Sequence, residues 1–401
     1  MSFINNVWYK GSLTGLGVSL ALYPFSLIFK CVSSIRRSLY GAGIKKSYAP
    51  DIPVVVVGGI TVGGSGKTPL CVALLKELKR HGYNPGLLSR GYKSQSNSFP
   101  LEIKEDTDSK ISGDEPLLIK QQTGAITVID PDRVRGAFYL KSLGVDIIVC
   151  DDGLQHYALS RDVEIAVLEG GRMLGNGMLL PSGPLREGKW RLGKVDAIVV
   201  NGAVARVGYF SMILKTSSIL SLKDKSPCDI AKGSDVCALA GIGNPERFYK
   251  TLEDYGFRVK DKIDVGDHLK ADIKKIRDMA SRMPVIMTAK DAIKYTSESL
   301  DNVFVLNIEA QFSHIFYDHI LKAIKDSDNK VSRRSAMNTD IKYNFEDKIQ
   351  VKAQSDKSVS AQIDTHSSQT DNDGKAKLPE ADKSTDSSEH KVLSEDKEDR
   401  R

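Results

Sequence analysis

A glycine-rich turn between an apolar strand and a helical pattern constrains this chain more than any other feature. Apolar residues 54–57 lead into Gly-Gly-Ile-Thr-Val-Gly-Gly-Ser-Gly, which ends in Lys67 and Thr68. In such a turn, backbone N–H groups face phosphate oxygens, while the lysine ammonium and threonine hydroxyl reach the β/γ-phosphates and Mg²⁺. A helical pattern follows and stops at Gly82. The spacing predicts a phosphate-binding loop and ATP or GTP as the ligand.

The loop departs from the general pattern at one position, because Thr61 stands where the first glycine is expected. A chance glycine-rich turn is the alternative interpretation. Pro69 nevertheless suits the first turn of a helix, because a backbone N–H at that position would have no intrahelical partner. The expected nucleotide-binding residues are Thr61, Val62, Gly63, Gly64, Ser65, Gly66, Lys67 and Thr68.

The order of strands and helices predicts an α/β fold. Short apolar strands are expected at 52–57, 84–88, 125–129, 146–150, 164–168 and 197–200, with helical lengths between them. This alternation is typical of a P-loop NTPase-like, doubly wound, mostly parallel sheet. Ligands of such sheets bind beyond the carboxyl ends of the strands. A smaller C-terminal α/β unit is expected, with strands at 236–240, 257–263, 285–288 and 303–308.

We therefore expect four parts: an N-terminal helix (1–48), a nucleotide-binding domain (49–234), the smaller domain (235–325) and a tail (326–401). The tail is polar and carries 14 Lys+Arg against 17 Asp+Glu. Such a composition predicts disorder. The remaining chain is basic, which is compatible with nucleic acid, anionic lipid or a phosphorylated substrate. Five cysteines without metal-ligand spacing indicate a reducing compartment.

Residues 11–29 contain no charged side chain and are nearly long enough to span a bilayer. A buried core helix is the alternative. Basic residues follow directly, however, and favour anionic headgroups: Lys30, Arg36, Arg37, Lys45 and Lys46. An apolar face that continues through Leu39 is also typical of a helix lying in the interface. We expect a membrane-associated helix, either spanning or interfacial.

Acidic side chains follow the expected strand at 146–150. Asp151 and Asp152 precede Gly-Leu-Gln155-His, and such acids beside a phosphate loop resemble a Walker B element that organises Mg²⁺. An ordinary Asp-Gly turn is the alternative.

Asp114 and Glu115 open another expected helix, where the helix dipole favours negative charge. Simple capping explains them equally well, whereas the functional interpretation makes Asp114 a general base for an attacking hydroxyl. His268 follows a polar turn and is either a surface residue or a partner of Asp114.

Two basic segments complete the candidate site. Arg186 and Glu187 follow a loop rich in Gly and Pro, and Arg186 can stabilise charge on a transferring phosphoryl group. Arg90 and Tyr92 follow the second expected strand, where a phosphorylated, partly apolar substrate can bind. Ordinary surface pairs are the alternative for both.

Taken together, these motifs resemble the tetraacyldisaccharide 4′-kinase family of lipid A biosynthesis. The resemblance covers about residues 1–325, and Thr61 is the residue that this family's loop carries. The motifs lie at 59–69, 88–92, 113–116, 151–156, 184–187, 240–248 and 288–294. The resemblance does not include the tail.

The resemblance implies an ATP- and Mg²⁺-dependent kinase that phosphorylates the 4′-hydroxyl of an acylated glucosamine disaccharide 1-phosphate at the cytoplasmic face of the inner membrane. It implies neither a nucleic-acid partner nor an obligate protein partner. By similarity, Asp114 and His268 form the general-base dyad. The implied phosphate-stabilising residues are Lys67 and Arg186, the residues arranging metal and nucleotide are Asp151 and Asp152, the substrate-binding residues are Arg90, Tyr92 and Glu187, and the candidate metal ligands are Thr68, Glu115 and Asp151.

Two other readings stay open. One is a membrane-tethered P-loop ATPase or GTPase, acting as a switch or in transport, in which Gln155 positions water. The other is a soluble enzyme like dethiobiotin synthetase, for which the N-terminal segment would be dispensable.

Overall fold

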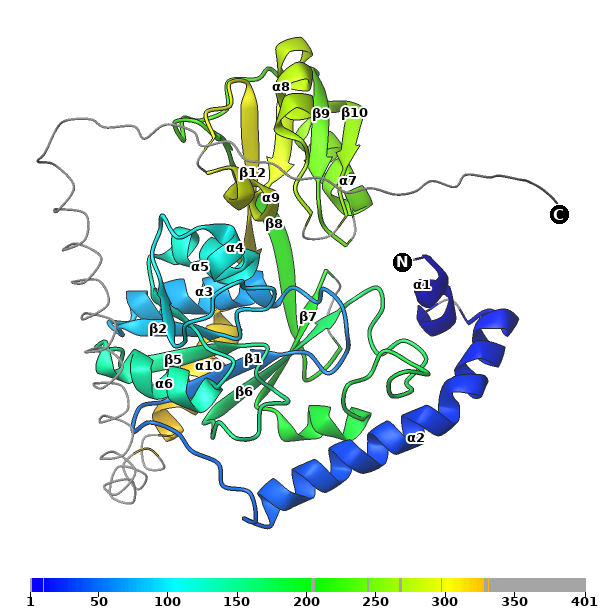
Figure 1. Cartoon of the computed structure of the whole chain (residues 1–401), viewed down its shortest axis with the longest axis vertical. Coiled ribbons are helices and arrows are strands. Elements are labelled where there is room, and N and C mark those ends of the chain that lie inside the picture. Colours follow the sequence, from blue (N-terminus) through cyan, green and yellow to red (C-terminus); the bar gives the residue numbers. More distant parts are fainter. Residues whose placement is uncertain are drawn as a thin grey trace, which may run out of the picture. The chain divides into compact units, whose positions relative to one another are not determined.

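The computed structural model describes residues 2–9, 11–202, 206–243, 245–266, 269–296, 298–327 and 331 (Figure 1). Its helices are α1 (Ser2–Tyr9), α2 (Leu13–Gly41), α3 (Lys67–Arg80), α4 (Ser109–Ser112), α5 (Asp114–Thr123), α6 (Arg133–Ser142), η1 (Lys189–Lys194), α7 (Pro245–Tyr255), α8 (Ile273–Arg282), α9 (Ala289–Ala292), η2 (Ile293–Tyr295) and α10 (His314–Asp326). Its strands are β1 (Val54–Gly58), β2 (Pro85–Ser89), β3 (Leu101–Ile103), β4 (Ile126–Ile129), β5 (Ile147–Asp151), β6 (Val163–Glu169), β7 (Ala197–Asn201), β8 (Phe210–Ser221), β9 (Asp235–Ala240), β10 (Arg258–Asp264), β11 (Val285–Thr288) and β12 (Val303–Gln311).

The strands form one sheet in the order β10-β9-β11-β12-β8-β7-β6-β1-β5-β2-β4-β3. Strand pairs within it are parallel apart from β3–β4 and β8–β12, which are antiparallel. The predicted α/β class with a mostly parallel sheet is therefore confirmed. The tail, for which disorder is predicted, lies outside the described residues beyond position 331.

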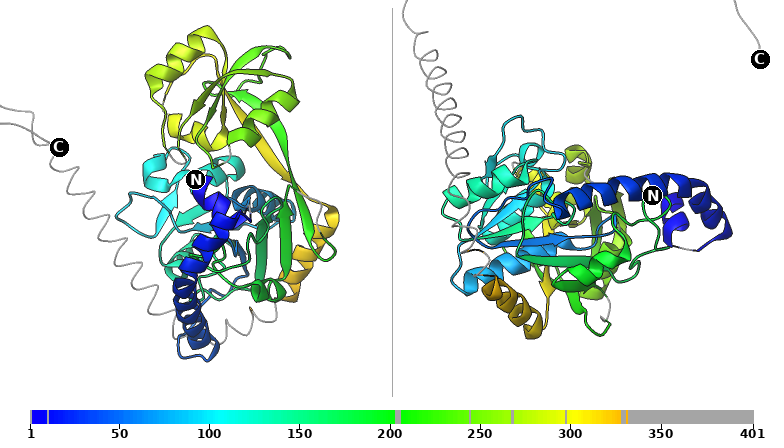
Figure 2. Two further views of the ribbon diagram at one scale, coloured as in Figure 1. Left: turned by 90° about the vertical axis from the view of Figure 1, so that its right-hand side faces the viewer. Right: turned by 90° about the horizontal axis from the view of Figure 1, so that it is seen from below.

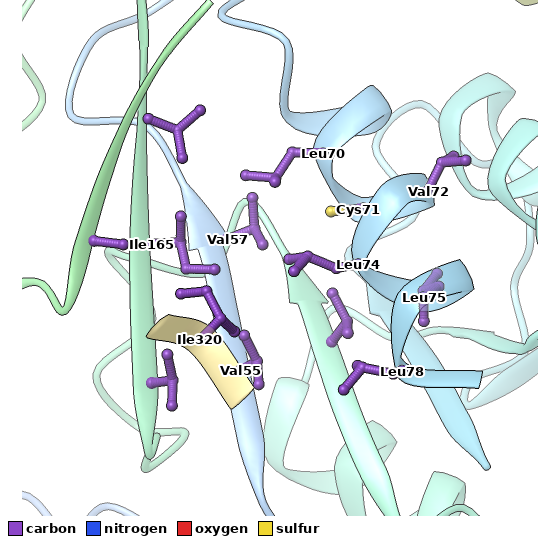
Figure 3. Packing of buried hydrophobic residues seen from close by; sticks show 14 of the residues in the cluster. Val55, Val57, Leu70, Cys71, Val72, Leu74, Leu75, Leu78, Ile165 and Ile320 are labelled. Carbon is purple, nitrogen blue, oxygen red and sulfur yellow. The ribbon is translucent and has the colours of Figure 1, made fainter. Parts of the chain in front are cut away.

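Helices cover both faces of the sheet around β1. Val55 and Val57 face a core cluster built from α3 and α10, whereas Val54 and Val56 face a second cluster that includes α6. Figure 3 shows Leu70, Leu74 and Leu78 of α3 in the first cluster. Because successive side chains of a strand point to opposite faces, a continuous apolar run such as 54–57 is needed to bury both. Each fully buried valine or leucine contributes about 1.5–3 kcal/mol to this packing.

The long strand β8 joins the two parts of the sheet and was absent from our expectations. It pairs with β7 on one side and with β12 on the other. After β12 the chain returns to the first part, since Phe316, Ile320 and Ile324 of α10 are buried in the cluster around α3. The division at 49–234 and 235–325 remains a prediction. The last helix of the second range packs in the core of the first, so the two ranges share part of one core.

Helix α2 runs along the segment between β6 and β7 (Figure 2). One face of this largely apolar helix is attached to that segment by two buried serines. Ser19 Oγ donates to the Ser182 carbonyl at 3.0 Å, and Ser26 Oγ donates to the Leu179 carbonyl at 3.0 Å. Large apolar side chains remain exposed elsewhere on the helix: Leu13, Leu16, Leu20, Phe25, Leu27, Ile28, Val32 and Ile35. By length and composition, α2 is apolar enough to cross a membrane.

Candidate active site

The phosphate-binding loop lies between buried β1 and the first residue of α3, Lys67. Gly66 has a φ of 96°, and a Cβ at this position would lie 2.5 Å from Asn201 Nδ2, so a side chain is excluded. Asn201 itself ends β7 and donates to the Ser65 carbonyl at 3.2 Å. The Ser65 hydroxyl is buried without a hydrogen-bond partner among the described residues. The expected strand–turn–helix context of the loop is thus present.

A short segment after the Gly- and Pro-containing loop is tied to the phosphate-binding loop by backbone hydrogen bonds. Val62 N donates to the Pro184 carbonyl at 2.9 Å, and Arg186 N donates to the Ile60 carbonyl at 2.7 Å. These bonds place Arg186 next to the expected nucleotide-binding residues, although it lies 118 to 125 positions after them in sequence. The position of Arg186 is therefore set by the fold and could not be predicted from sequence spacing.

Asp152 lies between two cations. Its carboxylate is 3.6 Å from Lys67 Nζ and 2.9 Å from Arg186 Nη1. Burial by itself would raise the pKa of Asp152, but Lys67 and Arg186 outweigh burial and hold it below its ordinary value. Its backbone has a φ of 48°, which is uncommon outside glycine and typical of functional sites. Three predicted residues therefore form one charged group.

Asp151 occupies a different environment at the end of β5. It pairs in register with Val57 of β1, so its carboxyl group lies where β1 enters the loop. Cys71 Sγ donates to Asp151 Oδ1 at 3.8 Å. Burial, and then repulsion from Glu115, raise the pKa of Asp151 to about 7. The pKa of Asp151 therefore lies above the ordinary value of an aspartate, whereas the pKa of Asp152 lies below it.

The carboxylates at the start of α5 face lysines from the later part of the chain. Asp114 Oδ2 lies 3.9 Å from Lys294 Nζ, and Glu115 Oε1 lies 3.6 Å from Lys290 Nζ. Gly113 is the N-cap residue and no side chain caps the helix, so Asp114 is not a capping residue in the usual sense. His268, the expected partner of Asp114, lies outside the described residues.

The donor set around Asp151 suits Mg²⁺. Glu115 and Asp151 repel each other electrostatically, and a divalent cation beside them would remove the penalty that raises the Asp151 pKa. The described residues contain no group of three His, Cys, Asp or Glu able to hold a metal by themselves. Magnesium sites in phosphoryl-transfer enzymes use one or two carboxylates and complete their shell with phosphates and water. Thr68, the second residue of α3, offers a hydroxyl.

The carboxylate of Glu187 is hydrogen-bonded to neighbouring side chains and is not exposed to solvent. It is buried, accepts from Gln155 Nε2 at 2.8 Å and accepts a short hydrogen bond from the Tyr157 hydroxyl. Gln155 Nε2 also donates to the Gly59 carbonyl at 3.1 Å. Its carboxylate therefore holds Gln155 beside the loop, and a contact between Glu187 and substrate stays a prediction. Arg90 and Tyr92, in contrast, are exposed after β2.

Arg133 is a site residue that the sequence reasoning missed. It begins α6, is 1% exposed and donates from Nη2 to the Asp151 carbonyl at 2.9 Å. Its Nε and Nη1 are buried without hydrogen-bond partners in the described part of the chain. Burial, followed by Arg133, Arg36 and Arg90, lowers the pKa of His156 to about 4. Arg133 lies just after β4, at the edge where ligands bind in parallel sheets, and this position was the sequence signal that could have identified it.

The chain is similar to known proteins over most of its length. A family model described as tetraacyldisaccharide-1-P 4′-kinase matches residues 18–325. The tetraacyldisaccharide 4′-kinase of Shewanella piezotolerans is 42% identical over 328 residues, covering 81% of this chain and 97% of that protein. The corresponding kinase of Vibrio parahaemolyticus is 41% identical over 324 residues, covering 80% and 97%.

A solved structure also matches. The crystal structure of LpxK from Aquifex aeolicus in complex with ATP has a TM-score of 0.64 and 27% identity, and the match covers 77% of this chain and 99% of that one. The Walker-like loop, the paired aspartates and the carboxylates of α5 thus lie in a chain that matches the family over most of its length. The chain belongs to the tetraacyldisaccharide-1-P 4′-kinase family.

Proposed function

We propose that this protein transfers the γ-phosphate of ATP to the 4′-hydroxyl of an acylated glucosamine disaccharide 1-phosphate. The observation that carries the proposal is the group of Lys67, Asp152 and Arg186 at one sheet edge, with Glu115 close enough to raise the pKa of the neighbouring Asp151. Family membership supplies the substrate class, because the matching relatives are named as kinases of this disaccharide.

The phosphate-binding loop and Lys67 bind the β- and γ-phosphates through N–H groups and an ammonium. Asp152 holds Lys67 and Arg186 at opposite oxygens, which orients both cations before the nucleotide binds. Arg186 then stabilises negative charge on the transferring phosphoryl group. Asp114, with His268, takes the proton from the attacking hydroxyl as general base.

Mg²⁺, once bound with ATP, would neutralise charge on the β/γ oxygens. Asp151, Glu115 and Thr68 are the residues that we assign to hold it. Asp151 must ionise to do so, and its raised pKa means that metal binding releases a proton near neutral pH.

The substrate is anionic, and its site should be basic. Arg90 and Tyr92 follow β2 on the edge that also carries Asp151, because β2 and β5 are parallel neighbours. Arg133, two of whose nitrogens have no hydrogen-bond partner among the described residues, adds a cation on the same edge. We propose that Arg90 and Tyr92 contact the phosphorylated sugar, whereas the buried Arg133 and Glu187 support the site through the Asp151 carbonyl and Gln155.

Helix α2 supports a location at the cytoplasmic face of the inner membrane, where ATP and the lipid substrate meet. Its buried serines hold it to the loop that leads to Arg186, and its exposed apolar side chains are available to lipid. Arg36 and Arg37 lie near its C-terminal end and suit anionic headgroups. The protein would thereby bring its active site to a substrate that stays in the bilayer.

The ATPase or GTPase alternative receives less support. Its hydrolytic mechanism requires Gln155 to position water, but the side-chain amide of Gln155 is bonded to Gly59 and Glu187. Family membership points the same way.

The direct test is to incubate purified protein, labelled ATP and a detergent-solubilised acylated disaccharide monophosphate, and to look for a bisphosphorylated lipid. We expect product with wild type and none with Lys67→Ala. Lipid-independent release of phosphate without labelled lipid would contradict the proposal and favour the ATPase reading.

A further inference from the structure

The motif at 288–294 contains a buried ion pair that the proposed function does not use. Asp291 is 1% exposed and Lys294 is 9% exposed, and Lys294 Nζ lies 2.9 Å from Asp291 Oδ1. Buried charges cost free energy unless they are paired and hydrogen-bonded. The pair therefore requires an explanation beyond the stability of η2.

Asp291 is held rigidly and serves as an anchor for Lys294. Its Oδ2 accepts from Gly241 N at 2.9 Å and from Thr288 Oγ1 at 2.6 Å. Asp291 N in turn donates to Thr288 Oγ1, which caps α9. With these partners in place, Asp291 Oδ1 fixes the position of the Lys294 ammonium.

Among the described residues, the hydrogen bonds of the Lys294 ammonium use two of its three donors. A lysine ammonium carries three N–H donors. Nζ donates to Asp291 Oδ1 at 2.9 Å and to the Leu269 carbonyl at 3.0 Å. Among the described residues, Asp114 Oδ2 is a further charged oxygen near it, at 3.9 Å, an ion-pair distance that a movement of about 1 Å would convert into a hydrogen bond.

Packing keeps the two side chains facing each other. Ile293, the residue before Lys294, is buried in a cluster with Leu117 of α5, Ile103 and Ile129. Asp114 is the first residue of α5, so the same contact that buries Ile293 sets the distance between α5 and η2. Leu269, which accepts from Lys294, follows His268 directly in the sequence.

We propose that Lys294 is a positioning residue for the general base. It holds the Asp114 carboxylate toward the attacking hydroxyl and, through the Leu269 carbonyl, fixes the chain immediately after His268. This inference rests on the proposed function, because it assigns Lys294 a role only if Asp114 accepts a proton during phosphoryl transfer. It adds to that function by making the later part of the chain responsible for the orientation of the base.

The test is a double-mutant cycle in the lipid kinase assay, comparing Lys294→Met, Asp114→Asn and the two together. We expect Lys294→Met to lower kcat about ten-fold, with the KM for ATP changed less than about two-fold, because positioning acts on the transition state. In the Asp114→Asn background the same change should cost less than about two-fold, since the group that Lys294 positions is already lost. Lys294→Arg, which keeps the charge, should recover part of the kcat.

Two further variants keep the result interpretable. Lys294→Met leaves Asp291 as an unpaired buried charge, so Lys294→Met with Asp291→Asn is measured as well, with thermal unfolding to confirm folding. Lys223→Met removes a lysine of an exposed ion pair with Asp301 and should keep wild-type kcat. Full additivity with Asp114→Asn, or an unchanged kcat in folded Lys294→Met, would overturn the proposal. Absence of lipid product from wild type and Lys223→Met would instead overturn the proposed function.

Discussion

Asp151 and Asp152 are adjacent and chemically identical, yet the structure predicts opposite effects when each is changed to asparagine. Burial and Glu115 raise the pKa of Asp151 from 3.8 to about 7. At Asp152 burial is outweighed by Lys67 and Arg186, which lower the pKa. Asp151→Asn should therefore stabilise the nucleotide-free protein at pH 8, whereas Asp152→Asn should destabilise it.

The sign follows from linkage between protonation and folding. For Asp151 the folded pKa exceeds the unfolded pKa, so its contribution is fully present below about pH 4 and is lost as the pH rises through about 7. The whole shift corresponds to about 4 kcal/mol, of which about 3 kcal/mol falls between pH 5 and pH 8. This is an upper limit, because water and Glu115 can relax around the charge. We expect the advantage of Asp151→Asn to grow by about 1–3 kcal/mol over that interval.

For Asp152 the folded pKa is below the unfolded value, so its contribution is present above about pH 4 and is lost as the pH falls through the folded pKa. The loss caused by Asp152→Asn should accordingly be present at neutral pH and diminish on acidification. The two variants thus serve as controls for each other, because both remove one carboxylate from the same turn.

The assay is urea unfolding of wild type and both variants in detergent at pH 5, 6, 7 and 8, followed by circular dichroism. Mg²⁺ with ATP should cancel the advantage of Asp151→Asn, because the wild-type carboxylate then gains a cation. A difference between Asp151→Asn and wild type that stays constant from pH 5 to pH 8 would refute the electrostatic reasoning, as would destabilisation by Asp151→Asn at pH 8.

Three further outcomes are expected. Lys67→Ala should abolish lipid phosphorylation, since it removes the ammonium at the β/γ-phosphates and leaves Asp152 with Arg186 as its remaining ion-pair partner; turnover near wild type would remove the basis of the site. Asp114→Asn should lower kcat by about 10²-fold or more while ATP affinity, measured with a fluorescent nucleotide, changes little; a large loss of affinity at unchanged kcat would make Asp114 a structural residue or a metal ligand. Removal of residues 332–401, whose composition does not favour a packed core, should leave activity within a few-fold, and failure of the shortened chain to fold would show that the tail contributes to the structure.

The local patterns were sufficient for the elements around the nucleotide. The strand at 54–57, the loop and the start of α3 are contiguous in sequence, so hydrophobicity and glycine spacing reveal them directly. β8 was missed because its polar residues, including Lys215 and Thr216, break the apolar run expected of a central strand. β8 is partly exposed and is stabilised by pairing with β7 and β12. This pairing cannot be predicted from the local sequence of the strand.

The candidate site divides in the same way. Asp151, Asp152 and Asp114 were recognisable because each follows a strand or opens a helix beside a phosphate loop. The buried hydrogen bonds of Glu187 and the position of Arg133 were not predicted, because burial and hydrogen bonding decide whether a charged side chain faces a ligand or supports a neighbour. Neither property is visible in a list of residues.

By itself, the sequence determined the α/β class, the nucleotide loop and the kinase family, since these depend on residue types at short and regular spacing. The tertiary structure alone decided that Arg186 joins Lys67 around Asp152, and that Lys294 reaches Asp114 from 180 positions further along the chain. The physical reason is that charges separated so widely in sequence interact only after core packing brings their strands and helices to one edge of the sheet. Packing therefore sets the electrostatics, and the electrostatics separate the roles of residues that look alike in sequence.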